Sequence, residues 1–151
     1  MNSKRIRIIF FIAFLAYILI VLRLTIFRTG TFDERQLNLA IFADLIHVFR
    51  NVGVGRFLWL FFGNIGWFVP FGFLLPVLLK RESFLKVIVI GLMFSLTIES
   101  LQFIFRVGVA ELDDLILNTL GTAIGYLLFK FTSKRFLADM SKDASNGGGR
   151  V

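Results

Sequence analysis

The chain has 151 residues, of which 57% are hydrophobic and 20 are phenylalanine. Soluble domains contain roughly 45 to 50% apolar residues, so this composition argues against a soluble domain and predicts an integral membrane protein. There is no cysteine, which excludes disulfides and thiolate chemistry. The formal charge is +7, but the basic residues flank apolar segments instead of forming a patch with aromatic residues. We therefore expect no nucleic-acid partner.

Four apolar segments come close to the roughly 20 residues that a membrane-spanning helix needs. They predict an all-α, four-helix membrane bundle in one domain, residues 1–133, followed by a disordered cytoplasmic tail, residues 134–151. No small-residue cleavage pattern follows the first segment, so we expect an uncleaved anchor instead of a signal peptide. The expected spans are 6–24, 57–79, 84–105 and 115–131.

The chain between the first two spans contains a candidate amphipathic helix, residues 37–52. Asp44, His47 and Asn51 fall on one face at spacing i, i+3 and i+7, and an apolar face lies opposite. This pattern is typical of a helix that lies in the membrane interface. His47 is the only histidine in the sequence, and one histidine alone does not make a metal site.

The second span contains Asn64 and Pro70. Because proline removes an internal hydrogen bond and clashes with the preceding turn, we expect a kink near Gly66 to Pro70 and a broken helix. Asn64 then lies in the outer half of this helix. The sequence leaves open whether its amide bonds a neighbouring helix or serves a functional site.

Basic residues cluster before the first span, between the second and third spans, and after the fourth. By the positive-inside rule, this pattern predicts a multi-pass protein of the cell membrane with both termini in the cytoplasm. The interfacial helix and the acidic loop at 106–114 then lie outside.

Polar side chains interrupt the third span on one face. Glu99, Gln102 and Arg106 stand at i, i+3 and i+7 of the same helix. A charged residue in an apolar span is costly, so such residues indicate a site with partners.

A matching face occurs in the fourth span, where Asp114 and Asn118 align with Gly121 and Gly125. The glycines allow close approach of another helix and also leave a homodimer open. If the two polar faces meet, Arg106 can reach Asp114 or Glu99. We therefore predict a polar ligand-binding site in the outer half of the bundle, formed by Asn64, Glu99, Gln102, Arg106, Asp113, Asp114 and Asn118, with Pro70, Gly121 and Gly125 in structural roles.

Three interpretations of this cluster stay open. It is a clamp that fixes helix packing, a pocket for a polar head group, or an acid–base site with Glu99 or Asp114 as the catalytic candidates. A hard cation held by Glu99, Asp113 and Asp114 is chemically feasible. Arg106 competes for those carboxylates, so we expect no metal, and the sequence calls for no cofactor.

Several motifs resemble the VanZ-like family of small bacterial membrane proteins. They are GNIGWFVPFGFLLP at 63–76, the Glu99-x-x-Gln102 pair, and DDLILNTLGTAIGYLL at 113–128. The segment 38–42 is similar to the family's Asn-Leu-x-Pro-Phe element, except that Ile41 stands in place of the proline. The positions that match the family's motifs are Asn64, Pro70, Glu99, Gln102, Asp114 and Asn118.

The resemblance implies a role at the cell surface, because the family's namesake lowers susceptibility to the lipoglycopeptide teicoplanin. Two hypotheses follow from it. In the first, the protein binds a membrane lipid, a lipid-linked wall precursor or a lipoglycopeptide and limits access of the drug. In the second, it is a membrane enzyme that modifies such a lipid, with Glu99 or Asp114 as general acid or base and Arg106 holding an anionic head group.

Overall fold

The computed structural model describes residues 3–26, 31–79 and 83–147. These parts form five helices and two three-residue strands, and four of the helices are long and apolar enough to cross a membrane. The all-α membrane architecture predicted from the sequence is confirmed. The elements are α1 (Ser3–Thr25), β1 (Gln36–Asn38), α2 (Ala43–Asn51), α3 (Val54–Leu78), α4 (Phe84–Phe105), β2 (Val109–Glu111) and α5 (Leu112–Gly147).

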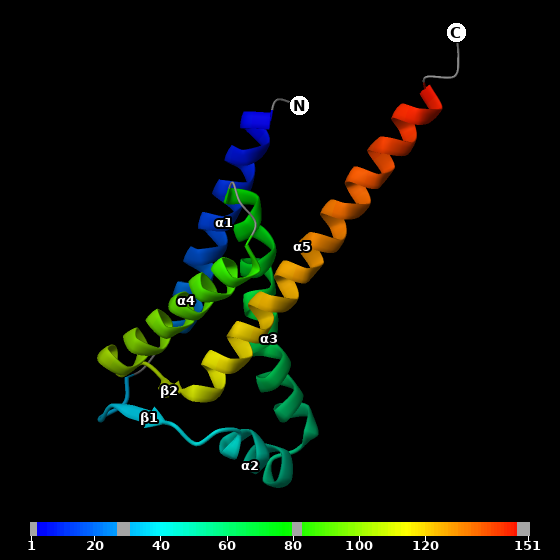
Figure 1. Ribbon diagram of the computed structural model, residues 1–151. Coiled ribbons are helices and arrows are strands. Elements are labelled where there is room, and N and C mark those ends of the chain that lie inside the picture. The colour runs from blue at the N-terminus through cyan, green and yellow to red at the C-terminus, as the bar shows by residue number, and fades with distance from the viewer. Residues whose placement is uncertain (1–2, 27–30, 80–82, 148–151) are drawn as a thin grey trace.

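The four long helices α1, α3, α4 and α5 run in alternating directions (Figure 1). The first turns of α1 and the last turns of α5 lie toward one end of the bundle, called here the terminal end. The two strands and α2 gather at the opposite end, called here the strand end. Four membrane crossings require this arrangement, with both chain ends on one side.

Helices α3 and α5 form the main helix pair of the bundle. An added Cβ at Gly121 would overlap the carbonyl oxygen of Ile65, and one at Gly125 would overlap that of Val69. The two backbones therefore touch along the glycine face of α5, as is common between membrane helices.

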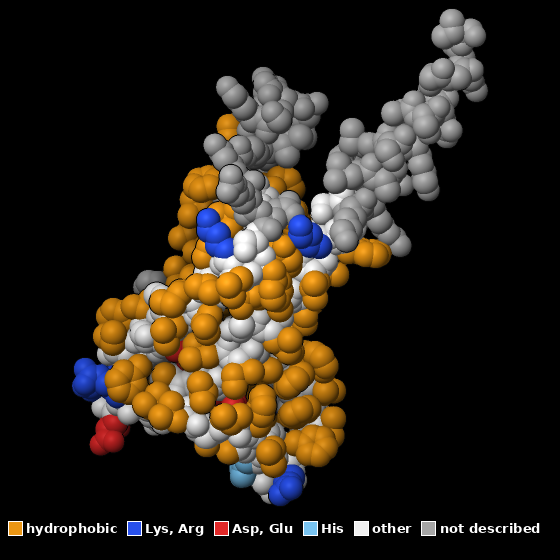
Figure 2. Space-filling model, viewed as in Figure 1, with side chains coloured by type: hydrophobic (Ala, Val, Ile, Leu, Met, Phe, Trp, Pro, Cys, Tyr) orange, Lys and Arg blue, Asp and Glu red, His pale blue; other side chains and the backbone are white. Residues whose placement is uncertain are grey.

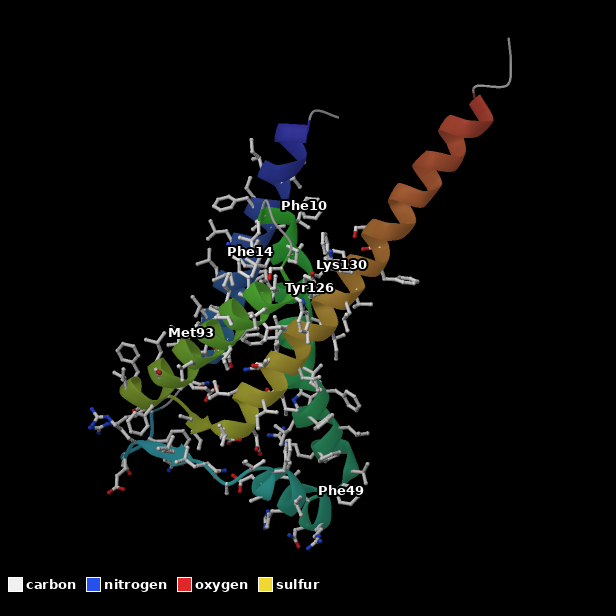
Figure 3. All side chains as sticks on the ribbon, viewed as in Figure 1. Phe10, Phe14, Phe49, Met93, Tyr126 and Lys130 are labelled. Carbon is white, nitrogen blue, oxygen red and sulfur yellow. The ribbon has the colours of Figure 1, made fainter. Side chains whose placement is uncertain are left out.

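Aromatic residues fill the space between the other helices. Phe71 of α3 stacks on Phe94 of α4 with ring centroids 5.1 Å apart, and Phe71 also contacts Phe14 of α1. Figure 3 shows Phe14 and Tyr126 in the half of the bundle toward the terminal end, whereas Phe49 lies at the strand end. The buried core comprises Val21, Phe68, Phe71, Leu75, Val87, Ile98 and Tyr126.

The outer surface of the bundle is apolar. Ile12 and Leu19 of α1 are each 59% exposed, as expected of side chains that face lipid. Figure 2 shows hydrophobic side chains over the middle of the visible face, with the described charged side chains mostly toward its two ends.

The segment predicted as one amphipathic helix, residues 37–52, is instead β1 followed by a shorter helix, α2. β1 pairs in parallel with β2, and Phe42 adopts a left-handed conformation (φ 55°) just before α2 begins. The side chain of Asn38 also accepts a 3.0 Å hydrogen bond from the Ala40 amide, which favours a turn over a helix. The expected helix is present as α2, but it begins at Ala43, because the residues before it pair with a distant strand and such pairing leaves no periodic signal in the local sequence.

Two further differences concern helix continuity. α3 is one continuous helix through Pro70, where the sequence predicted a broken helix; the hydroxyl of Tyr17 donates to the Trp67 carbonyl oxygen in this turn. This bond lies next to the Gly66 carbonyl oxygen, which Pro70 leaves without its intrahelical donor, and it joins α1 to α3 at this turn. α5 continues to Gly147, past the predicted end of the fourth span at 131 and into the segment assigned to the tail.

Candidate functional site

The chain reverses direction at the strand end and brings α4 and α5 together there. α4 ends at Phe105, and Arg106 adopts a left-handed conformation (φ 57°). β2 then leads directly into α5. The Glu111 amide donates a 2.9 Å hydrogen bond to Oε2 of Glu99, so β2 is attached to a buried carboxylate of α4.

A cavity of about 410 Å³ opens beside this turn, between α2, α3, β2 and the first turn of α5. We call it the polar cavity. Two basic side chains, His47 and Arg56, line it, and both are exposed. Its other polar lining residues are Asp44, Asn64, Gln102, Glu111, Asp113 and Asp114.

Hydrogen bonds to carboxylates hold the walls of the polar cavity together. The Asn64 amide donates to Oδ1 of Asp114, which links α3 to α5. The Phe42 amide donates to Oδ1 of Asp113 at 2.7 Å, which links the start of α2 to α5. Asp113 and Asp114 lie in the first turn of α5, where the helix dipole favours negative charge.

Two oxygen atoms in this wall lack hydrogen-bond partners. Oδ2 of Asp113 and Oε1 of Gln102 are buried and unpaired, in side chains that are 2% and 6% exposed. Leaving a buried acceptor unpaired costs about 1 to 3 kcal/mol. Both unpaired atoms are acceptors, so what this part of the wall lacks is hydrogen-bond donors.

The Glu111 carboxyl has an altered acidity. Burial, followed by the negative charges of Asp114, Asp44 and Asp113, raises the pKa of Glu111 to about 7. A carboxyl with this pKa exchanges its proton near neutral pH, as general acids and bases do.

A second cavity, of about 380 Å³, lies on the other side of β2. We call it the apolar groove. Only Glu99, Ser100 and Glu111 interrupt its hydrophobic lining, and Glu111 lines both cavities. The hydrophobic lining residues are Leu37, Leu39, Leu96, Phe103, Ile104, Ala110, Leu112 and Leu115.

The structure brings together only part of the predicted site. Asn64, Gln102, Asp113 and Asp114 line the polar cavity, and Glu99 lines the apolar groove. Asn118 lies deeper between helices, where its amide donates to Oγ of Ser95 at 2.9 Å. Pro70, Gly121 and Gly125 line neither cavity.

Arg106 does not make the contact expected with Asp114 or Glu99. It is exposed, and its Nη1 donates to the Asp33 carbonyl oxygen at 2.9 Å. The helical spacing failed here because α4 ends at Phe105 and the left-handed backbone of Arg106 redirects its side chain.

Sequence reasoning missed Asp44 and Glu111 as residues of the site. Asp44 was assigned to the polar face of a helix in the membrane interface, and Glu111 to an outer loop. The concentration of carboxylates was visible in the sequence, but which of them turn inward depends on the pairing of β1 with β2. Within residues 3–26, 31–79 and 83–147, no three histidine or carboxylate side chains are grouped so that they could hold a metal ion.

This fold and site define a small multi-pass helical membrane protein with a polar cavity and an apolar groove at one end of its bundle. Residues 10–133 match the model of the VanZ/LLP1 family, and the chain belongs to this family. It is 30% identical over 132 residues to Protein VanZ of Enterococcus faecium, an alignment that covers 87% of this chain and 76% of that protein. No solved structure matches the chain.

Proposed function

We propose that this VanZ-family protein binds an amphiphilic molecule of the cell envelope at the strand end and thereby lowers susceptibility to teicoplanin-type antibiotics. The polar head occupies the polar cavity, and the apolar part occupies the apolar groove. The candidate ligands are a membrane lipid, a lipid-linked wall precursor and a lipoglycopeptide. One observation carries the proposal: Glu111 lines both cavities, so a polar and an apolar site lie on the two sides of one residue.

The sizes of the two cavities favour binding over a purely structural clamp. Each lies within the range of about 300 to 1,000 Å³ that is usual for small-molecule sites. Clamp contacts are also present, because Asn64 bonds Asp114 and Asn118 bonds Ser95. A clamp alone requires neither cavity, so we infer that these contacts hold the walls of a binding site.

We further propose that the strand end faces the outside of the cell. Of the 17 lysine and arginine residues, 11 lie toward the terminal end by their position in the sequence, including every lysine, and six arginines lie toward the strand end. By the positive-inside rule, the end with the excess of lysine and arginine faces the cytoplasm. The site is then open to envelope molecules and to drugs arriving from outside.

A susceptibility assay with matched variants tests the role of the apolar groove. Ile104→Trp replaces an aliphatic side chain of the groove lining with a larger indole ring. Phe105→Trp changes an exposed neighbour that does not line the groove. With equal surface expression, the wild type and Phe105→Trp should raise teicoplanin tolerance of a susceptible host, and Ile104→Trp should not. Equal tolerance with both variants would contradict the proposal.

One observation favours a second candidate, a membrane enzyme that modifies an envelope lipid. Glu111, with a pKa of about 7, stands where the head group of a lipid would meet its chain. Glu111 joins Glu99 and Asp114 as a candidate acid or base. Mass spectrometry of envelope lipids decides between the two functions: a lipid species that depends on the wild type and is lost with Glu111→Gln supports the enzyme, and an unchanged lipid profile supports binding alone.

A further inference from the structure

We propose that the head group held in the polar cavity carries a protonated amine. This inference rests on the proposed function, because it names the chemical class of the ligand at the same site. It does not depend on whether the amine belongs to a resident lipid or to a molecule that enters from outside.

The hydrogen-bonding pattern of the cavity wall favours a ligand that donates hydrogen bonds. Oδ2 of Asp113 and Oε1 of Gln102 are buried acceptors without donors, and both residues line the cavity. Their other polar atoms are engaged: Oδ1 of Asp113 accepts from the Phe42 amide, and Nε2 of Gln102 lies 3.4 Å from the Thr25 carbonyl oxygen. The unmet need is therefore for donors. An ammonium group has three donors and no acceptor.

The carboxyl groups around the cavity favour a ligand with a positive charge. Four carboxyl groups line it, from Asp44, Glu111, Asp113 and Asp114. The first turn of α5 carries two aspartates of its own, Asp113 and Asp114, whose negative charges oppose binding of an anion at this helix end. An anionic head would meet repulsion here, whereas a cationic head would be paired.

The positions of the basic residues are consistent with this polarity. Arg106, which the sequence suggested as a partner for an anionic head, bonds Asp33 and does not line the cavity. His47 and Arg56 line the cavity but are exposed. A bare metal cation is a poorer candidate, because no group of three metal ligands is found in the described parts of the chain.

The apolar groove can hold the acyl or alkyl chain of a ligand whose amine lies in the polar cavity. Glu111 lines both the groove and the polar cavity, so the proposed molecule has its head on one side of this residue and its alkyl chain on the other. The ligand class is therefore an amphiphile with a protonated amine next to an acyl or alkyl chain.

Three single-chain probes with the same alkyl chain test the inference: dodecylamine, dodecyl phosphate and dodecanol. Their affinities for the purified full chain are compared in detergent by native mass spectrometry. Because charge-assisted hydrogen bonds exceed neutral ones, dodecylamine should bind about tenfold or more tightly than the other two. Asp113→Asn keeps an acceptor for the Phe42 amide but places a donor in the wall, so it should abolish the preference for the amine without weakening binding of dodecanol.

Asp33→Asn is the matched control, because it removes the same charge from an exposed position outside both cavities. It should behave as the wild type. If Asp113→Asn fails to fold, Asp44→Asn replaces it, since Asp44 lies in the lining on the exposed helix α2.

The outcomes separate this inference from the proposed function. Equal binding of the three probes, or tightest binding of the phosphate, would overturn the amine and leave amphiphile binding intact. If neither the wild type nor Ile104→Trp binds any of the three probes, both the amine inference and the proposed function are overturned. A lipid amine that copurifies with the wild type and is displaced by dodecylamine identifies a resident ligand, whereas an empty protein that binds dodecylamine identifies an external one; either result supports the inference.

Discussion

The Glu111 amide donates a 2.9 Å hydrogen bond to Oε2 of Glu99, and this bond joins the end of β2 to a buried carboxylate of α4. Glu99 lines the apolar groove, and Glu111 lines both the groove and the polar cavity. One contact thus fixes the position of the turn that separates the two cavities.

Removing the acceptor in this contact should destabilise the protein. Glu99→Ala leaves the Glu111 amide without its partner and should lower the free energy of unfolding by about 1 to 3 kcal/mol. Glu99→Gln keeps an oxygen at the same position, so its free energy of unfolding should fall much less. Thermal unfolding in detergent measures both, and an equal loss in the two variants would show that the hydrogen bond is not the stabilising element.

The glycine face of α5 should not tolerate a methyl group. Gly121→Ala and Gly125→Ala drive a Cβ into carbonyl oxygens of α3, so each should cost about 1 to 3 kcal/mol or more. Gly63→Ala is the control, because a Cβ there meets nothing within 4 Å. It should be neutral or stabilising by up to about 1 kcal/mol. Similar melting temperatures for all three variants would contradict the close packing of α3 on α5.

The ionisation of Glu111 should make stability depend on pH. Because the folded state raises the pKa of Glu111 from 4.5 to about 7, it binds the proton more tightly than the unfolded chain does. The contribution of this residue to stability is therefore greatest at low pH and is lost as the pH rises from 4.5 to about 7. In Glu111→Gln this loss should be absent, and the variant should melt above the wild type at pH values beyond 7. Parallel curves of melting temperature against pH for the two proteins would contradict the raised pKa of Glu111.

The Asn64–Asp114 hydrogen bond should couple α3 to α5 energetically. A double-mutant cycle with Asn64→Ala and Asp114→Ala should give an interaction energy of about 0.5 to 3 kcal/mol. The same cycle with Asn64→Ala and the distant, exposed Asp33→Ala should give almost none. Additive losses in the first cycle would mean that the bond does not link the helices.

Cysteine labelling tests the orientation of the bundle, and the absence of native cysteines makes the assay clean. Glu34→Cys lies between α1 and β1, and Ser141→Cys lies in α5 beyond its apolar span. A membrane-impermeant thiol reagent added to whole cells should label only Glu34→Cys. Labelling of Ser141→Cys alone would place the strand end in the cytoplasm.

The sequence predicts the membrane helices well because the bilayer imposes a length and an apolar composition that are visible locally. The expected third span, 84–105, has the same bounds as α4. The sequence also assigned Asn64 and Asp114 to one polar site, and their two side chains form a hydrogen bond.

The site could be predicted only in part because its shape depends on the strand end. The two three-residue strands pair although they lie far apart in the sequence, at Gln36–Asn38 and Val109–Glu111, and no local pattern marks them. Their pairing turns Glu111 inward, and the left-handed Arg106 turns its side chain away. Helical periodicity does not extend past a helix end, so the sequence placed Arg106 in the site and overlooked Glu111.

Photo-crosslinking tests the central claim most directly, that an amphiphile lies with its chain in the apolar groove and its head in the polar cavity. An alkyl amphiphile with a photoreactive group near the end of its chain is bound to the purified protein, and the adducts are mapped by mass spectrometry. We expect adducts at groove residues such as Phe103, Ile104 and Leu115, which Ile104→Trp should suppress and Phe105→Trp should not. Adducts that spread equally over the exposed face of α1, for example at Ile12, and that Ile104→Trp leaves unchanged would contradict this claim.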